Sequence, residues 1–540
     1  MLPPRAPSRA AACYDGRVKD ATRIARSALL LAALALVLPG CAPKLPVDEG
    51  TLVIAFPGAP TSIDPRLATD AYGEQILQMT HAFLIKRDAA GNPLPDLAES
   101  WEERSPTEIA FRLRSGAHFH DGREVTSSDV RYTFEWILDP KNRSPHRATY
   151  DKILKIEAPD PRTIVFCLKE PFAPFLVGMA RGIVPAGSGA RGYMPVPGAG
   201  PYRVDDFQPD ESVALSRFGG YHGRSPAIAK VIVKFIPDSN VRFLELKKGS
   251  VNFVLNGVDP DLLPAALKNP NLVTEEAPGS NVSYLGFNLR DRILSDARVR
   301  RAIALAIDRE AIVRTIWKGH ADLADSILPP GFWAYAEGLP PLRHDPAEAK
   351  QLLDRAGYRD PDGDGPKPRF TLTYKTSQNE LRRRIAAVIQ EQLRQVGIAV
   401  EVQSHEWGIF FSDIRKGNFQ LYSLTWVGIA DPDIYHYAFH SSQVPPEGAN
   451  RGWYANPELD RLVEEGRRER SRSKRKEIYR KVQLLLFRDL PVFPLWVNRN
   501  LLLRDRQLAG FTLAPDEDYT SVKEMRIDRQ DRGATGKAVP

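Results

Sequence analysis

Residues 111–122 read Phe111-Arg112-Leu113-Arg114-Ser115-Gly116-Ala117-His118-Phe119-His120-Asp121-Gly122, and the pattern of side chains changes along them. Up to Leu113 the stretch continues the alternation of residues 109–113, which predicts a half-buried strand. His120-Asp121-Gly122-Arg123 predicts a turn. Ser127-Ser128-Asp129 then predicts the capped start of a helix that runs to Ile137. Strand, turn and helix therefore follow one another within one short segment.

On both sides of this segment, predicted strands, turns and helices also follow one another through most of the chain. Residues 52–56 predict a buried strand, and a loop rich in turn-forming residues follows at 57–65. Further strands are predicted at 163–168, 229–236 and 400–402, and helices at 74–84, after 296 and at 381–396. The chain has no internal repeat and no long low-complexity segment. Strands that alternate with helices in this way predict an α/β fold.

The N-terminus has the pattern of an export signal. Six basic side chains precede an apolar run at 29–38, and Leu38-Pro39-Gly40-Cys41 ends the segment. The run is too short for a resident membrane helix, which needs ~20 residues. The last four residues resemble a bacterial lipobox, in which the cysteine takes a diacylglycerol and becomes the new N-terminus.

We therefore predict a lipoprotein signal peptide at 1–40, lipidation of Cys41 and a polar tether at 41–49. The protein would lie in the periplasm or on the cell surface, anchored to a membrane by its lipid. A plain secreted protein, in which Cys41 has no role, is the alternative.

Cysteine usage and charge narrow the class of the mature protein. Cys13 lies in the signal and Cys41 is the lipid site, so only Cys167 remains in the body and no intrachain disulfide can form there. Roughly 500 residues after the cut are enough for a large core and for about two or three domains. The first 40 residues hold six basic and two acidic side chains, so the formal charge of +7 falls to near +3 in the mature chain.

This charge is not the concentrated basic face of a nucleic-acid-binding protein, and we expect no nucleic acid partner. The one dense basic run, at 467–476, lies in a helical pattern with glutamates. It is interpreted as a solvated helix face.

Several segments, in order, carry a resemblance to a known family. Ala98-Glu99-Ser100-Trp101-Glu102 followed by residues 111–122 resembles the hallmark stretch of family 5 extracellular solute-binding proteins, the dipeptide-, oligopeptide- and nickel-binding receptors of ABC importers. The other matching segments, which extend the resemblance over more than 400 residues, are 197–202, 284–289, 297–309, 352–358 and 490–496.

The resemblance implies a bilobed α/β fold of the periplasmic-binding-protein type (type II, cluster C) with an extra inserted domain. By analogy, lobe I combines residues 50–83, 181–281 and 498–540, the inserted domain spans 84–180, and lobe II spans 282–497. The ligand would lie in a cleft between the lobes and stabilise their closed arrangement.

The resemblance also implies where the ligand binds. In peptide-binding members, a carboxylate three residues after a tryptophan pairs with the α-ammonium group of the peptide. The matching tryptophan is Trp426, and the matching acid position holds Ile429, which cannot form an ion pair. Asp431 and Asp433 can replace the acid only if the loop is shifted; otherwise they shape an Asx-Pro turn.

The ligand-binding residues that this resemblance implies are Trp426, Gly428, Asp431, Asp433, Tyr435, Arg181 and Asn288. Arg181 stands near the place where nickel-binding members have a cleft arginine. It either clamps a carboxylate or forms an ordinary ion pair.

Other polar patterns predict no chemistry. Residues 360–365 resemble the first half of a calcium loop, but the twelfth position is Thr371 instead of a glutamate. His118 and His120 share a strand face without a third ligand, and His436 and His440 lack the glutamate of a zincin motif. We expect no catalytic residue, no metal site and no cofactor.

We interpret the chain as an exported substrate-binding component of an ABC importer. It would be a monomer that captures peptides or a related small solute, such as a modified peptide, a sugar or a chelate, and delivers it to membrane permease subunits. Two alternatives stay open: an exported peptide hydrolase that uses His118, His120 or His436, and a receptor that senses a ligand without transport.

Overall fold

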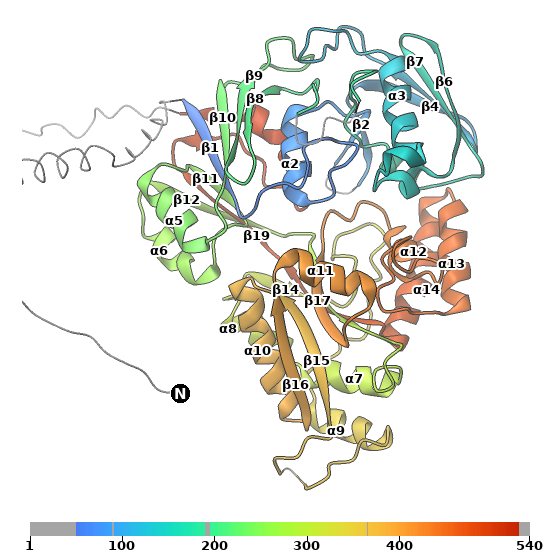
Figure 1. Ribbon diagram of the computed structural model, residues 1–540, viewed down its shortest axis with the longest axis vertical. Helices are drawn as coiled ribbons and strands as arrows, with labels where there is room; N and C mark the ends of the chain where they lie inside the picture. Colours follow the sequence, from blue (N-terminus) through green and yellow to red (C-terminus); the bar gives the residue numbers. More distant parts are fainter. Residues whose placement is uncertain (1–49, 89–90, 190–194, 364, 529–540) are drawn as a thin grey trace, which may run out of the picture. The chain divides into compact units, whose positions relative to one another are not determined.

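A computed structural model describes residues 50–88, 91–189, 195–363 and 365–528. The predicted signal peptide, the tether and Cys41 lie outside these residues. Within them, the chain forms one compact unit that starts at Gly50 (Figure 1). No helix in the described ranges is long and apolar enough to cross a membrane.

A seven-stranded sheet is built around the first strand. β1 (Thr51–Phe56) is buried along its whole length and pairs in parallel with β10 (Lys230–Phe235) and β11 (Phe253–Leu255). A strand covered on both faces reads as a continuous apolar run, which is why residues 52–56 lack alternation. The other strands are β8 (Tyr202–Gln208), β9 (Ser212–Arg217), β12 (Leu272–Ala277) and β19 (Asn500–Asp505), and the helices nearby are α2 (Ala71–Thr80), α5 (Ser239–Lys248) and α6 (Leu263–Leu267).

A separate four-stranded antiparallel sheet contains the segment quoted first. Its order is β4 (Ala98–Ser105), β5 (Glu108–Leu113), β7 (Thr163–Leu168) and β6 (Ile153–Asp160). Helix α3 (Ser127–Leu138) packs on it and starts at Thr126, which forms a capping box with Asp129. The predicted strand and helix are confirmed. The short elements of this region are β2 (Ile85–Arg87), β3 (Pro93–Pro95) and α4 (Phe175–Gly178).

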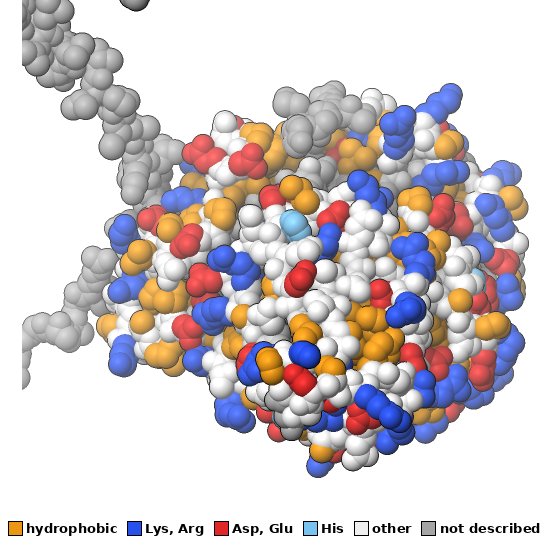
Figure 2. All heavy atoms as spheres, turned by 60° about the horizontal axis from the view of Figure 1, so that its bottom comes forward, with side chains coloured by type: hydrophobic (Ala, Val, Ile, Leu, Met, Phe, Trp, Pro, Cys, Tyr) orange, Lys and Arg blue, Asp and Glu red, His pale blue; other side chains and the backbone are white. Residues whose placement is uncertain are grey.

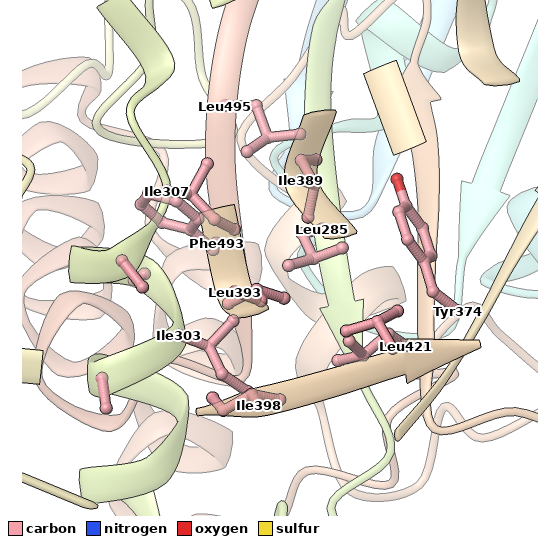
Figure 3. Packing of buried hydrophobic residues seen from close by; sticks show 14 of the residues in the cluster. Leu285, Ile303, Ile307, Tyr374, Ile389, Leu393, Ile398, Leu421, Phe493 and Leu495 are labelled. Atoms are coloured by element: carbon pink, nitrogen blue, oxygen red, sulfur yellow. The ribbon is translucent and has the colours of Figure 1, made fainter. Parts of the chain in front are cut away.

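The third large sheet has six strands and is mixed parallel and antiparallel. Its order is β14 (Ala321–Leu323), β18 (Val492–Asn498), β13 (Val282–Phe287), β17 (Leu421–Trp426), β15 (Phe370–Ser377) and β16 (Ile398–His405). Ile303 of α7 (Ala297–Ala306) and Leu393 of α10 (Glu380–Arg394) pack with Leu285 and Leu421 of the sheet in one buried cluster (Figure 3). The remaining helices at this sheet are α8 (Arg309–Thr315), α9 (Pro346–Arg355) and α11 (Trp407–Lys416).

Three C-terminal helices form their own apolar cluster. They are α12 (Ile434–Phe439), α13 (Pro457–Arg468) and α14 (Arg472–Asp489), which precede the short strands β20 (Leu508–Ala509) and β21 (Arg526–Ile527). The basic run 467–476 therefore spans the end of one helix and the start of the next. Figure 2 shows basic and acidic side chains interspersed over one face of the molecule.

Two chain segments connect the seven-stranded and six-stranded sheets, and they run side by side. One joins β12 to β13 and the other joins β18 to β19, and Asn498 N–H donates to Asn281 O at 3.2 Å. A Cβ on Gly279 would lie 2.0 Å from Asn498 O, so only glycine permits this close approach.

Candidate ligand site at the edge of the six-stranded sheet

The strands β15, β16 and β17 are parallel, so their carboxyl ends lie at one edge of the sheet. These ends are Ser377, His405 and Trp426. Helices α10 and α11 begin directly after two of them. Ligands of open α/β sheets bind outside the carboxyl ends of the strands. A ligand site is therefore expected at the end of the sheet that carries Trp426.

Trp426 is held in a defined position at this edge. Its ring stacks on Tyr284 with centroids 5.7 Å apart and planes 13° apart. The guanidinium carbon of Arg451 lies 5.2 Å from its ring centroid. Its indole Nε1 is buried and has no acceptor within the part of the chain that the structure describes. The sequence predicted Trp426 as a site residue, but it gave no signal for Tyr284 or Arg451.

Arg451 lies close to two aromatic side chains. Its guanidinium carbon is also 5.5 Å from the ring centroid of Phe411, and its Nη1 donates to Tyr284 Oη at 3.1 Å. Among the described residues, no carboxylate lies within ion-pair distance of this half-buried arginine. Burial raises the pKa of the neighbouring Tyr422 well above its usual value, so that phenol is neutral at pH 7.

Helix α11 adds an apolar surface beside Arg451. Trp407 is 55% exposed and stacks on Phe411 with centroids 5.5 Å apart. Ile409 of the same helix and Val427, next to Trp426, are also at least half exposed. Large exposed apolar side chains are a feature of surfaces that bind a partner or a ligand. A small pocket is lined among others by Tyr284, Trp426 and Arg451.

A second arginine at the same edge, Arg382, also has no acidic partner among the residues that the structure describes. Arg382, in the first turn of α10, donates to Thr425 Oγ1 at 3.0 Å and approaches Ser283 Oγ at 3.5 Å. Burial lowers its pKa. Ser283 and Thr425 are register partners, and side chains alternate along a strand, so Arg382 lies on the face of the sheet opposite to Tyr284 and Trp426.

Residues 427–433, which follow Trp426 and are called the motif loop below, carry two acids that already have partners within the protein. Arg475 donates to Asp431 through two hydrogen bonds of 2.6 and 3.0 Å, and Asp433 N–H donates to Asp431 Oδ1 at 2.9 Å. Arg467 Nε lies 3.1 Å from Asp433 Oδ1. Burial raises the pKa of Asp433 to about 6. The loop thus has the Asx turn that the sequence offered as the structural interpretation, and both acids face arginines rather than an open site.

This finding corrects the interpretation of the basic run 467–476. Most of its side chains are exposed, but Arg475 is buried and Arg467 is half-buried because each reaches an acid of the loop. The spacing of residues along the run 467–476 does not reveal these two ion pairs, because Asp431 and Asp433 lie in a different segment of the chain.

Three other predicted site residues have structural partners. Tyr435 is 1% exposed, and its hydroxyl lies 2.7 Å from Ser326 Oγ in the core, so it offers no stacking surface to a solute. Asn288 donates to Phe419 O at 2.8 Å and accepts from Arg290 N–H at 3.1 Å. Arg181 Nη1 donates to Glu74 Oε1 at 2.7 Å, the ion pair that was one of its two interpretations. Gly428 is exposed, with a φ of 66°.

The histidines of α12 are closer to a metal geometry than the sequence indicated. Glu464 of α13 joins His436 and His440, and the three ligand atoms lie within 4.8 Å of one another. However, Arg467 Nη1 lies 2.9 Å from His436 Nε2, and Ser442 N–H donates to His440 Nδ1 at 3.1 Å. The cluster is therefore an ion-pair and hydrogen-bond network in which a guanidinium stands where a cation would bind.

The other histidines of the hydrolase alternative have backbone partners. His120 Nε2 lies 3.1 Å from Gly200 O, and burial lowers its pKa to about 4. His118 is bonded to Gly116 O at 3.0 Å.

Several contacts cross between the parts of the chain that carry different sheets. Arg472 Nη1 donates to Asn92 Oδ1 at 2.6 Å, and Arg467 O accepts from Ala173 N–H at 2.7 Å. Asp261 pairs with Arg384 at 2.9 Å and with Lys318 at 3.2 Å. The motif loop and its neighbours are thus held against residues 91–173.

Comparison with known proteins places this geometry in a family. The profile described as "Bacterial extracellular solute-binding proteins, family 5 Middle" matches residues 92–445. The oligopeptide-binding protein AppA of Bacillus subtilis is 28% identical over 503 residues, which are 89% of this chain and 92% of AppA. The dipeptide-binding protein of Escherichia coli is 25% identical over 499 residues, which are 86% of this chain and 92% of that protein.

Solved structures agree with this assignment. The structure of AppA in complex with a nonapeptide superposes with a TM-score of 0.81, covering 89% of this chain and 99% of AppA, at 28% identity. This confirms the predicted α/β fold of the periplasmic-binding-protein type. The chain therefore belongs to the family 5 bacterial extracellular solute-binding proteins, and it is a solute-binding component of an ABC transporter and not an enzyme.

Proposed function

We propose that this protein captures peptides or related small solutes at the edge formed by Trp426, Phe411 and Arg451, and delivers them to a membrane permease. The observation that carries this proposal is the exposed aromatic surface of α11 beside an arginine that has no acidic partner in the described part of the chain. The names of the relatives, an oligopeptide-binding and a dipeptide-binding protein, support the solute class.

The division into lobes explains how capture would work. Lobe I would combine 50–83, 181–281 and 498–540, with 84–180 inserted and 282–497 as lobe II. The assignment is supported by the sheets, since each of these parts contains one of the three large sheets. The paired segments at Gly279 and Asn498 would be the hinge. A solute that contacts both lobes stabilises the closed state by its difference in affinity for the two states.

The site is tested by replacing the exposed aromatic surface. Trp407→Ala should weaken binding of a peptide mixture in native mass spectrometry, because the stacking surface is lost. Leu267→Ala is the matched control, since Leu267 is also a large exposed apolar side chain, at 71%, and lies on α6, away from the six-stranded sheet. Equal retention by both variants and the wild type would place the solute elsewhere.

The anchor is tested separately. We expect Cys41→Ser to move the protein from the membrane fraction to the soluble fraction, because a diacylated cysteine carries two chains at ~0.8 kcal/mol per buried methylene. An unchanged distribution on fractionation would remove the lipid anchor from the proposal.

A further inference from the structure

We propose that the solute carries a carboxylate or a comparable anionic group that binds to the guanidinium of Arg451, and that it needs no free amino group. This inference rests on the proposed capture of small solutes at the edge of the six-stranded sheet.

The first argument is the electrostatic environment of Arg451. Its guanidinium carbon lies near two rings, Phe411 at 5.5 Å and Trp426 at 5.2 Å, and the guanidinium has hydroxyl partners in Tyr284, at 3.1 Å, and Tyr422. A guanidinium has five N–H donors in a planar fork. The described residues supply these hydroxyl groups to it and no anion. The unused donors and the uncompensated charge match a carboxylate, which accepts two parallel N–H bonds.

The second argument is that the acids of the motif loop and Asp413 of α11 already have cations of their own. The acids of the motif loop, Asp431 and Asp433, lie opposite Arg475 and Arg467. Asp413 of α11, on the same helix as Phe411, accepts from Lys375 Nζ at 2.6 Å. Each of these carboxylates already has its own cation, so the charge of Arg451 is left for a partner from outside.

The third argument is the surplus of positive charge at this edge. Arg382 approaches the same end of β17 from the other face, and its side-chain partners there are the hydroxyl groups of Ser283 and Thr425. The amino ends of α10 and α11 also lie at this edge, where helix dipoles favour negative charge. Both features add to the attraction of an anion without supplying a binding site by themselves.

The absence of a site for an ammonium group completes the inference. Ile429 holds the position three residues after Trp426, and an apolar side chain cannot pair with a cation. An ammonium group brought to this loop would meet Ile429 and two carboxylates that are already bound by arginines. Solutes with an acylated or otherwise neutral amine avoid this cost.

The experiment uses two synthetic tripeptide libraries of the same sequences with the full-length protein. One library is N-acetylated with a free carboxylate, and the other has a free amine and a C-terminal amide. We expect native mass spectrometry and calorimetry to show retention of the acetylated acids, with at least tenfold weaker binding of the amides. Free and N-acetylated forms of one retained acid should differ by less than tenfold.

Variants separate binding from packing. Arg451→Met keeps an unbranched side chain beside Phe411 and Trp426 but removes the charge, and should weaken binding of the acetylated acids at least tenfold. Tyr284→Phe removes only the hydroxyl that holds the guanidinium and should weaken them less. Arg415→Met, an exposed arginine on α11, is the control and should leave binding unchanged. Melting curves identify a variant that loses binding because it fails to fold.

The outcomes distinguish this inference from the function on which it rests. Equal or stronger retention of the amides, or unchanged affinity in a folded Arg451→Met variant, would overturn the anionic ligand and leave solute capture intact. Retention of neither library by the wild type would overturn the inference and also count against peptides as the solute class.

Discussion

At the level of single residues, the loop that follows Trp426 uses its charges inside the protein. Asp431 and Arg475 have side chains only 10% and 7% exposed, and two hydrogen bonds join them. Removing one partner of a buried pair leaves the other charge without compensation. We expect Arg475→Met to lower the free energy of unfolding by about 3–5 kcal/mol.

A double-mutant cycle in urea unfolding checks this expectation. Adding Asp431→Asn to Arg475→Met should recover much of the loss, since the uncompensated charge is gone. The control is Arg461→Met, because the Arg461–Glu465 pair is exposed and should contribute less than ~1 kcal/mol. A loss no larger than that of the control would mean that the buried pair does not hold the loop.

Asp433 gives a pH dependence with a definite sign. Burial is the largest cause of its pKa of about 6, which lies above the usual 3.8 of an aspartate side chain. The folded state therefore binds the proton more tightly than the unfolded chain, and stability is lost as pH rises from about 4 through 6. Relative to Asp433→Asn, which stays neutral, the wild type should lose about 1–2 kcal/mol over this range.

Urea midpoints of the two proteins between pH 4 and pH 8 measure this difference. A difference that stays constant with pH would show that Asp433 does not titrate in this window.

The site shows which residues a sequence can and cannot predict. Trp426 lies where its motif places it, because the strand and the loop that position it are local in sequence. Arg451 was missed because its partners, Phe411, Trp426 and Tyr284, meet it only through the tertiary fold. The ion pairs of Asp431 and Asp433 join segments more than 30 residues apart, so spacing gave no signal for them.

At the level of elements, most of the periodic segments were predicted correctly. The strands at 52–56, 109–113 and 163–168 and the helix that ends near 137 agree with β1, β5, β7 and α3 to within a residue or so. The helix predicted at 74–84 is α2 (Ala71–Thr80), so the prediction placed both of its ends too far along the chain. The basic run 467–476 was less well predicted, because a helical pattern alone does not show that one helix ends at Arg468 and the next begins at Arg472.

The paired connecting segments give a prediction for Gly279. A Cβ there would lie 2.0 Å from Asn498 O, so Gly279→Ala should force the two segments apart and cost about 1–3 kcal/mol, as overpacking does. Gly178→Ala is the control, since nothing lies within 4 Å of its Cβ position. Thermal unfolding compares the two, and equal melting temperatures would show that the segments separate freely.

At the level of the whole molecule, the family assignment and the surface of α11 lead to the same function. The resemblance in the sequence predicted the fold correctly, because several motifs in a fixed order are specific to one fold. It did not specify the solute, because the side chains on which we base the proposed solute preference, Ile429 and Arg451, lie inside or beside a motif without belonging to it.

The central claim is that two lobes close on a captured solute. Small-angle X-ray scattering tests it directly, on protein stripped of solute in denaturant and refolded, and again after adding back the solute recovered from the denatured sample. We expect the radius of gyration to fall and the melting temperature to rise, the latter corresponding to ~2.7 kcal/mol at a hundredfold excess over the dissociation constant. Identical scattering curves and identical melting temperatures with and without the solute would contradict the account.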